Sequence, residues 1–344
     1  MFWSVGGFIF VGFLLRSGYK RKTQLESIQD TNIVPCHQAG MIYLYPDEVD
    51  LRIIVMTFSR SESLRKLLLS LNKLEMDGHK ASLEIWVDKK RDGDRHNIVD
   101  DLTLQIAQSF SWSRGQTRVH IHKKHVGIYG QWLDTWRPDR GGKELALFLE
   151  DDITVSPFAY RWLKAVHQKY GSRNDIAGYT LQSEQVKTAH IRRSINRPRH
   201  DAVFLYKLLG SWGYAPHPKS WCHFQDWYRE VKKDFDFHPY VSKAMIMTRW
   251  YKIFEKQNKQ DTMWTMWHIY YCDRFNKFTV YNNIPVLANS SSNLLSVNRM
   301  EAGLHFDRKR PDNTKNLLQF WSDDFIKLPD LPLSFDFDGT LTDK

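Results

Sequence analysis

The amino-acid sequence predicts an α/β protein built on a mostly parallel β-sheet with helices on both faces. Short apolar runs rich in β-forming residues alternate with longer stretches in which apolar residues recur at helical spacing. The clearest short runs are residues 51–58 (LRIIVMTF), 83–87 (LEIWV) and 145–149 (LALFL). Strands and helices that alternate in this way form parallel sheets, whose ligands lie at the carboxyl ends of the strands.

Each further element is predicted from its own pattern. Ser61 is expected to cap a helix in which Leu64, Leu67, Leu68 and Leu71 share one face. A stripe of Met and aromatic residues at helical spacing within residues 256–271 predicts a core helix. In chain order the remaining expectations are a helix over 61–74, a helix over 97–110, a strand over 118–122, a helix over 127–136, a helix over 157–170 and a strand over 175–181.

Composition and charge exclude several classes of protein. With 42% hydrophobic and 26% charged residues among 344, the chain is globular rather than disordered. Its 49 Lys and Arg against 39 Asp and Glu suit phosphate-bearing ligands or anionic surfaces. Nucleic acid is not expected as a partner, because the basic residues are scattered and no nucleic-acid-binding module is present. Three widely spaced cysteines exclude a disulfide scaffold, and a Cys222–Cys272 disulfide stays open.

The N-terminus predicts a membrane anchor. Residues 2–15 are apolar and uncharged, and basic residues follow from Arg16 onward. We expect residues 1–22 to be the anchor and residues 23–49 a polar stem, so the main domain begins near Asp50. A cleaved signal peptide and a buried segment are the alternatives. The basic residues after the run favour a cytosolic main domain by the positive-inside rule.

Three consecutive acids, Glu150, Asp151 and Asp152, directly follow the most apolar strand. Buried neighbouring carboxylates repel one another unless a positive charge neutralises them. A hard divalent cation with oxygen ligands provides that charge and leaves positions for a ligand's phosphates. The alternative is that these acids cap the next helix or pair with surface Lys or Arg. Ser59 and Asp88 follow two other predicted strands and are expected at the same edge.

These motifs, in this order, resemble nucleotide-sugar-dependent glycosyltransferases of the Rossmann-like GT-A fold. The chain looks most like the family-2-like enzymes and the N-acetylglucosaminyltransferase I group, whose metal motif is also Glu-Asp-Asp. Residues 210–214 (GSWGY) resemble a Gly-Ser-Trp-Gly-Trp segment of bacterial sugar transferases, and residues 289–305 resemble the end of the domain. The resemblance covers about residues 51–307 and weakens in the acceptor half.

The resemblance implies an inverting transfer of a hexosyl or N-acetylhexosaminyl group from a nucleotide sugar to a glycan or other hydroxyl acceptor. It also implies Mn²⁺ or Mg²⁺ as cofactor and a membrane-anchored protein of the Golgi or secretory pathway, with a lumenal main domain. Because the positive-inside rule favours a cytosolic main domain, the orientation stays open. The alternative function is a non-catalytic glycan-binding protein on a degenerate GT-A scaffold. By position, the implied roles are metal binding for Asp152 and His305, donor binding for Thr57, Ser59, Asp88, Glu150 and Asp151, acceptor binding for Trp212 and Gly213, and proton abstraction for Asp261.

Two assignments keep a structural alternative. Asp261 precedes the aromatic helix, so it is either the catalytic base or a helix N-cap. Residues 335–342 (FDFDGTLT) resemble the nucleophile motif of haloacid-dehalogenase-type phosphatases, but the chain ends at Lys344, so this motif is expected to be inert. We expect a domain over residues 50–310 and a C-terminal tail over residues 311–344, of which residues 331–344 are dispensable for activity.

Overall fold

The computed structural model describes residues 45–91, 98–138, 144–182, 201–284, 298–300 (backbone only) and 317–342. The chain divides into two compact units, residues 1–42 and 43–344, and every described residue belongs to the second. The predicted anchor and almost all of the predicted stem lie outside the described residues. In the ranges that are described, no helix is both long and apolar enough to cross a membrane.

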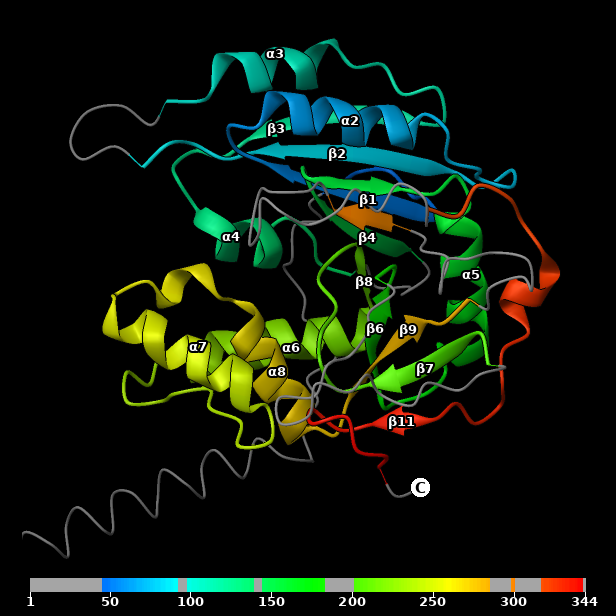
Figure 1. The fold of residues 1–344 in the computed structure, drawn as a ribbon. Coiled ribbons are helices and arrows are strands. Elements are labelled where there is room, and N and C mark those ends of the chain that lie inside the picture. The colour runs from blue at the N-terminus through cyan, green and yellow to red at the C-terminus, as the bar shows by residue number, and fades with distance from the viewer. Residues whose placement is uncertain are drawn as a thin grey trace, which may run out of the picture. The chain divides into compact units, whose positions relative to one another are not determined.

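A single mixed sheet organises the described residues, with its strands in the order β11-β7-β9-β6-β8-β4-β1-β2-β3 (Figure 1). The strands β4, β1, β2 and β3 are parallel neighbours, whereas β8 runs antiparallel between β4 and β6. A separate antiparallel pair joins β5 to β10. The bounds are β1 Leu51–Thr57, β2 Ala81–Val87, β3 Gln116–Ile121, β4 Leu145–Glu150, β5 Ile153–Val155, β6 Ile176–Thr180, β7 Val203–Tyr206, β8 Tyr214–Pro216, β9 Phe278–Asn282, β10 Asn298–Met300 and β11 Ser334–Phe335.

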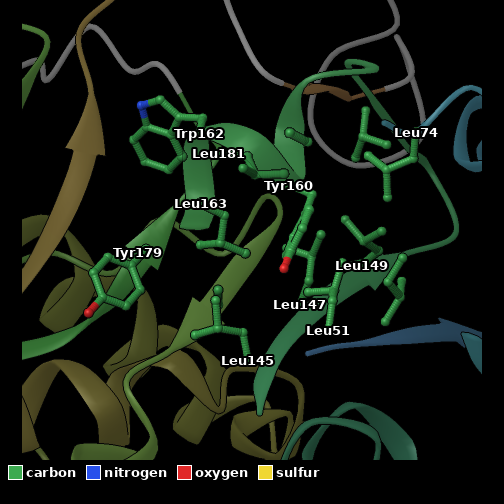
Figure 2. Close-up of a cluster of buried hydrophobic side chains, with 14 of the residues drawn as sticks. Leu51, Leu74, Leu145, Leu147, Leu149, Tyr160, Trp162, Leu163, Tyr179 and Leu181 are labelled. Atoms are coloured by element: carbon green, nitrogen blue, oxygen red, sulfur yellow. The ribbon is translucent and has the colours of Figure 1, made fainter. Parts of the chain in front are cut away.

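Helices cover both faces of this sheet. Alternate residues of β1 and β4, such as Leu51, Leu147 and Leu149, pack with Tyr160 and Leu163 of α5 in the core shown in Figure 2. This core also takes in the apolar sides of α2 and α3. The helices are α2 Ser61–Leu71, α3 Asp101–Ser109, α4 Gly127–Leu133, α5 Ala159–Tyr170, α6 Pro218–Val231, α7 Met245–Lys256 and α8 Thr265–Arg274, with 3₁₀ turns η1 Gln260–Thr262 and η3 Asp323–Ile326.

Aromatic side chains fill the opposite face. Phe148 of β4 points away from the leucines beside it and contacts Trp132 of α4 and Trp221 of α6, with ring centroids 5.1 and 5.7 Å apart. Trp264, directly before α8, stacks on Trp132 at 4.4 Å. The aromatic stripe near residues 256–271 is therefore core, as predicted, although the helix that carries it begins only at Thr265.

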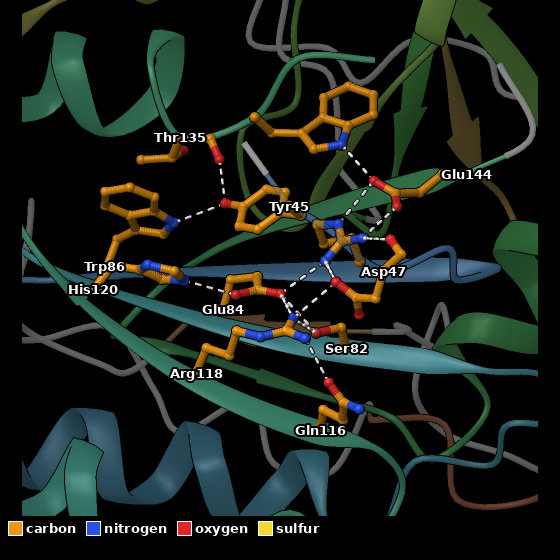
Figure 3. A network of polar contacts seen from close by, with 12 residues as sticks. Tyr45, Asp47, Ser82, Glu84, Trp86, Gln116, Arg118, His120, Thr135 and Glu144 are labelled. Atoms are coloured by element: carbon orange, nitrogen blue, oxygen red, sulfur yellow. Dashed lines mark hydrogen bonds and ion pairs between the residues drawn. The ribbon is translucent and has the colours of Figure 1, made fainter. Parts of the chain in front are cut away.

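A buried ion network ties the start of the domain to the same face of the sheet (Figure 3). Arg52 of β1 lies 2.8 Å from a Glu84 oxygen and 2.7 Å from a Glu144 oxygen, and all three are at most 9% exposed. Its Nη2 also donates to the carbonyl of Asp47 at 2.8 Å. His120 of β3 contacts the second Glu84 oxygen at 2.7 Å. Ion pairs inside a sheet thus hold residues 45–47 in place.

The α/β fold with one helix-flanked sheet is confirmed, and several local predictions are corrected. Ser61 does not cap α2, because it is the first helical residue and no side-chain cap bond forms there. The helix near residue 100 begins at Asp101, since the Asp100 side chain accepts a hydrogen bond from the Thr103 N–H. Cys272 is a free, buried thiol, so the Cys222–Cys272 disulfide does not form.

The expected domain end at residue 310 is also wrong. β11 pairs in parallel with β7, and the whole segment 317–342 belongs to the second unit. Phe335 and Phe337 are 2% and 6% exposed. Between them, the buried Asp336 lies 2.6 Å from the Lys243 ammonium. The motif that resembles a phosphatase nucleophile is therefore an edge strand followed by a tight turn at Gly339 (φ 82°).

Candidate functional site

The candidate site lies at the carboxyl ends of β1 and β4. The two strands are parallel, with Met56 opposite Glu150, so the residues that follow each strand meet at one edge. Thr57 Oγ1 donates to Asp151 Oδ2 at 2.8 Å. The Arg60 guanidinium then bridges both aspartates, with Nη2 2.8 Å from Asp151 Oδ1 and Nη1 3.0 Å from Asp152 Oδ2. The two carboxylate side chains are 0% and 1% exposed, against 32% for Arg60.

The electrostatics of this pair favour additional positive charge. Burial raises the pKa of the Asp151 carboxyl to about 6, and the opposing effects of Arg60 and Thr57 are smaller. The neighbouring Asp152 raises the pKa of Asp151 further. Two neighbouring buried carboxylates repel one another, and their ionised forms are costly in a medium of low dielectric constant.

The donor set fits a divalent cation that is shared with a phosphate ligand. The described residues contain no group of three or more His, Cys, Asp or Glu side chains able to hold a metal ion. Mg²⁺-like ions, however, are usually bound through one or two carboxylates together with substrate phosphates and water. Asp151 Oδ1 is buried and accepts no hydrogen bond of good geometry, although it lies within ion-pair distance of Arg60. Asp151 and Asp152 thus offer part of a coordination sphere.

His305, predicted as a further metal ligand, lies outside the described residues. Nearby backbone pairing is described: β10 is antiparallel to β5, with Met300 opposite Ile153. Ile153 directly follows Asp152, so the chain reaches Met300 beside the acidic pair, five residues before His305 in the sequence.

Asp88 is engaged by the backbone around it, and its predicted contact with the donor stays a prediction. Its carboxylate accepts backbone N–H bonds from Lys89 and Val126 at one oxygen and from Gly127 at the other, at 2.8–2.9 Å. His125 Nδ1 lies 3.0 Å from the second oxygen. The three N–H groups use three of the about four acceptor positions of a carboxylate. Asp88 therefore holds the loop at the start of α4.

The other predicted donor residues flank the pair. Ser59 is exposed in the loop between β1 and α2, and Glu150 is half-buried at the last position of β4. Gln131 of α4 was not predicted. Its Nε2 donates to the Thr57 carbonyl at 3.1 Å, and this hydrogen bond fixes the end of β1 against α4.

Trp212 and Gly213 lie beside the acidic cluster. Tyr214 of β8 pairs antiparallel with Phe148 of β4, so residues that precede Tyr214 run alongside those that follow Phe148. Gly213 has φ 71°, and a side chain there would meet Leu181 at 3.0 Å. Trp212 is half-buried against the core, which leaves only part of its ring for a sugar.

Asp261 is not a helix N-cap. It lies in η1, and α8 begins four residues later with Trp264 at its N-cap position. Its side chain is 57% exposed and forms an ion pair with Arg91, which follows β2, at 3.6 Å. The Tyr129 hydroxyl of α4 donates to the Gln260 carbonyl at 3.0 Å. Asp261 thus belongs to the side of the edge formed by β2 and α4.

Arg60 is the site residue that sequence reasoning missed. It lies 92 positions before Asp152, and its contact with both aspartates depends on the register between β1 and β4. The available signal was a basic residue three positions after a strand expected to lie beside the acid-bearing one.

Comparisons with known proteins give distant likenesses only. No family model matches the chain, and no curated protein matches it. Among solved structures, residues 1–349 of S. aureus TarS align with a TM-score of 0.39 and 12% identity, over 70% of this chain and 58% of that one. This chain therefore spans less than two thirds of that structure.

Two further solved structures are similar at the same level. TarS in complex with UDP-GlcNAc aligns with a TM-score of 0.30 and 15% identity, over 42% of this chain and 38% of that one. The mannosyltransferase PcManGT from Pyrobaculum calidifontis, in complex with GDP-Man and Mn²⁺, aligns with a TM-score of 0.32 and 9% identity, over 58% and 51%. At such scores, these likenesses assign neither family nor activity to this chain.

Proposed function

We propose that the protein is a metal-dependent glycosyltransferase that moves a sugar from a nucleotide-sugar donor to a hydroxyl group of a glycan or similar acceptor. The observation that carries this proposal is the buried Asp151–Asp152 pair at the carboxyl edge of the sheet. Two neighbouring buried carboxylates favour a divalent cation, and a cation with free positions binds phosphates. Such an edge is also where α/β sheets receive their ligands.

Each site residue has a role in this proposal. Asp152, with His305, holds Mn²⁺ or Mg²⁺, and Asp151, oriented by the Thr57 hydroxyl, offers the ion a second carboxylate. When bound, the ion supplies positive charge that stabilises the leaving nucleoside diphosphate. Ser59 and Glu150 line the donor position. Asp88 shapes the donor position indirectly, because its carboxylate holds the Val126–Gly127 loop.

The acceptor half provides a base and a platform. Asp261 is exposed beside α4 and takes the proton of the acceptor hydroxyl. The acceptor oxygen bonds to the anomeric carbon on the face opposite the leaving diphosphate, the bond to the diphosphate breaks, and the configuration inverts. Trp212 and Gly213 border the acceptor position next to the acidic pair.

The decisive experiment is a screen of UDP- and GDP-sugars for Mn²⁺-dependent hydrolysis by the full chain. We expect at least one donor to be hydrolysed, and Asp152→Ala to abolish both turnover and Mn²⁺-dependent nucleotide binding. Asp324→Ala, which removes an exposed aspartate of η3, is the matched control and should retain both. A protein that binds glycans but leaves every nucleotide sugar intact would instead be the glycan-binding alternative.

We further propose that residues 1–22 anchor the protein to a membrane of the secretory pathway. The support is the uncharged apolar run of residues 2–15. Asn289-Ser290-Ser291 is the only N-glycosylation sequon of the chain, and it is modified only if the main domain is lumenal. Sensitivity of the expressed protein to endoglycosidase H, lost in Asn289→Gln, would establish that orientation, whereas an unglycosylated, membrane-extracted protein would place the domain in the cytosol.

A further inference from the structure

We infer that Arg60 and the divalent cation compete for the same two carboxylates, so that the ion binds tightly only after a nucleoside diphosphate has drawn Arg60 away. This inference rests on the proposed function and adds to it an order of binding. Arg60 then acts as a positioning residue that keeps the acidic pair neutralised while no donor is bound.

The contacts show why both charges do not fit together. Asp151 Oδ2 already accepts the Thr57 hydroxyl, whereas the buried Oδ1 accepts no hydrogen bond of good geometry and faces Arg60 Nη2 at 2.8 Å, so Oδ1 is the oxygen best placed to meet a cation. Asp152 Oδ2 faces the other arm of the same guanidinium at 3.0 Å. A divalent cation must approach carboxylate oxygens to about 2.0–2.6 Å. At that position it would displace the guanidinium hydrogens and meet a like charge.

The Arg60 side chain can also leave the aspartates for another partner. It precedes the first turn of α2, its side chain makes no capping bond there, and it is 32% exposed whereas both aspartate side chains are at most 1% exposed. Guanidinium groups bind phosphate oxygens through two parallel N–H donors. A diphosphate arriving at this edge therefore offers Arg60 an equivalent partner, and the vacated carboxylates receive the ion.

Competition of this kind makes nucleotide and ion binding cooperative, because each ligand removes an obstacle to the other. Mn²⁺ binding to the full chain can be followed by the electron paramagnetic resonance signal of the free ion, after subtraction of the Mn²⁺ that the nucleotide binds in the absence of protein. For the wild-type protein we expect UDP or GDP to tighten Mn²⁺ binding by about tenfold or more, within the range usual for coupled sites. Arg60→Gln should bind Mn²⁺ alone about tenfold more tightly than wild type, and added nucleotide should tighten its Mn²⁺ binding by a smaller factor than in wild type.

The matched control is Arg65→Gln. It removes the same charge from a nearby position, inside α2. Arg65 is 55% exposed and pairs only with Glu62 among the ion pairs described for it, so Mn²⁺ binding should equal that of wild type. Arg60→Lys retains the charge without the two-armed contact and should give a smaller gain, and it replaces Arg60→Gln if that variant does not fold. Thermal unfolding supplies a second readout, because Mn²⁺ alone should raise the Tm of Arg60→Gln more than that of wild type.

The inference is overturned if neither Arg60 variant binds Mn²⁺ more tightly than Arg65→Gln. In that case Mn²⁺ binding by the wild-type protein shows whether the competition alone is wrong or the metal-dependent function as well. If it still binds Mn²⁺ in the presence of UDP or GDP, the proposed function stands and only the competition is wrong. If it binds no Mn²⁺ under either condition, the metal-dependent function falls as well.

Discussion

At the scale of single residues, Asp151 is expected to make stability depend on pH. Burial raises its pKa from 3.8 to about 6, so the folded protein binds this proton more tightly than the unfolded chain does. The stabilising contribution is therefore complete below about pH 3.8 and is lost as the pH rises through about 6. A shift of this size corresponds to about 3 kcal/mol.

Urea denaturation between pH 4 and 7.5 checks this prediction. Because Asn does not titrate, the free energy of unfolding of wild type relative to Asp151→Asn should fall as the pH rises, mostly between pH 4.5 and 6.5. Asp324→Asn, which removes an exposed carboxylate, should follow the wild-type curve closely. Parallel curves for wild type and Asp151→Asn would show that burial does not raise the pKa of the Asp151 carboxyl.

Asp261 supplies the second prediction at this scale. If it is the base, Asp261→Asn should lower transfer by a factor on the order of 10²–10⁴ while donor binding is retained, because Asn cannot accept the proton. Arg91→Gln removes the partner of Asp261 across 3.6 Å without removing the carboxylate, and should change the rate only severalfold. A transfer rate near wild type in Asp261→Asn, or retention of anomeric configuration in the product by NMR, would assign the base elsewhere.

At the scale of elements, the ion network beneath β1, β2 and β4 sets a strong stability prediction. Arg52→Met leaves Glu84 and Glu144 buried without their common cation (Figure 3). Breaking a buried pair by removing one partner costs about 3–5 kcal/mol. Arg118 of β3 forms the exposed arm of the network, because it pairs with Asp47 at 2.9 Å and Glu84 at 3.0 Å while its side chain is 28% exposed. Arg118→Met should therefore cost clearly less.

Chemical denaturation of both variants tests this order of effects. Nucleotide binding by folded Arg52→Met should be unchanged, because Arg52 and Thr57 lie at opposite ends of β1, about 17 Å apart at the usual rise of a strand. Equal stability of Arg52→Met and Arg118→Met would mean that the buried arm of the network contributes no more than its exposed arm.

The elements also show which parts of the sheet the sequence could predict. β1, β2, β4 and α5 follow from apolar runs and helical spacing, because their local pattern and their burial agree. Arg52 and Glu84 interrupt those runs, and only the fold makes them partners. The strands β7 and β8 are too short for their sequence pattern to predict them, and they form because they pair with neighbouring strands.

At the scale of the whole molecule, the position of the acidic pair was predictable and its partner was not. Three acids after an apolar strand point to the carboxyl edge of the sheet, wherever that edge lies. The contact between Arg60 and Asp152 joins residues 92 positions apart, and it exists only because β1 and β4 are adjacent in parallel. Strand order is a property of the complete chain, which local patterns do not contain.

The same dependence on the complete chain reverses the expectation for the C-terminus. Deleting residues 331–344 removes β11, which pairs with β7 through hydrogen bonds from the Leu205 and Lys207 N–H groups to the carbonyls of Leu333 and Phe335. It also uncovers the small core around Phe204 and Tyr281 and leaves the buried Lys207 without Asp336. An unpaired strand edge beside exposed aromatic rings favours aggregation.

We therefore expect this deletion to lower the Tm strongly or to abolish soluble expression, with turnover lost together with folding. Deleting only residues 343–344 is the matched control and should leave both unchanged. Phe335→Ala isolates the packing contribution, because Phe335 is 2% exposed and truncating a buried phenylalanine costs about 3–5 kcal/mol. The outcome that would contradict this prediction is a protein without residues 331–344 that unfolds at the wild-type temperature and hydrolyses its donor at a rate within about a factor of two of wild type. In that case β11 would contribute no stability to the sheet, and the domain would end before it.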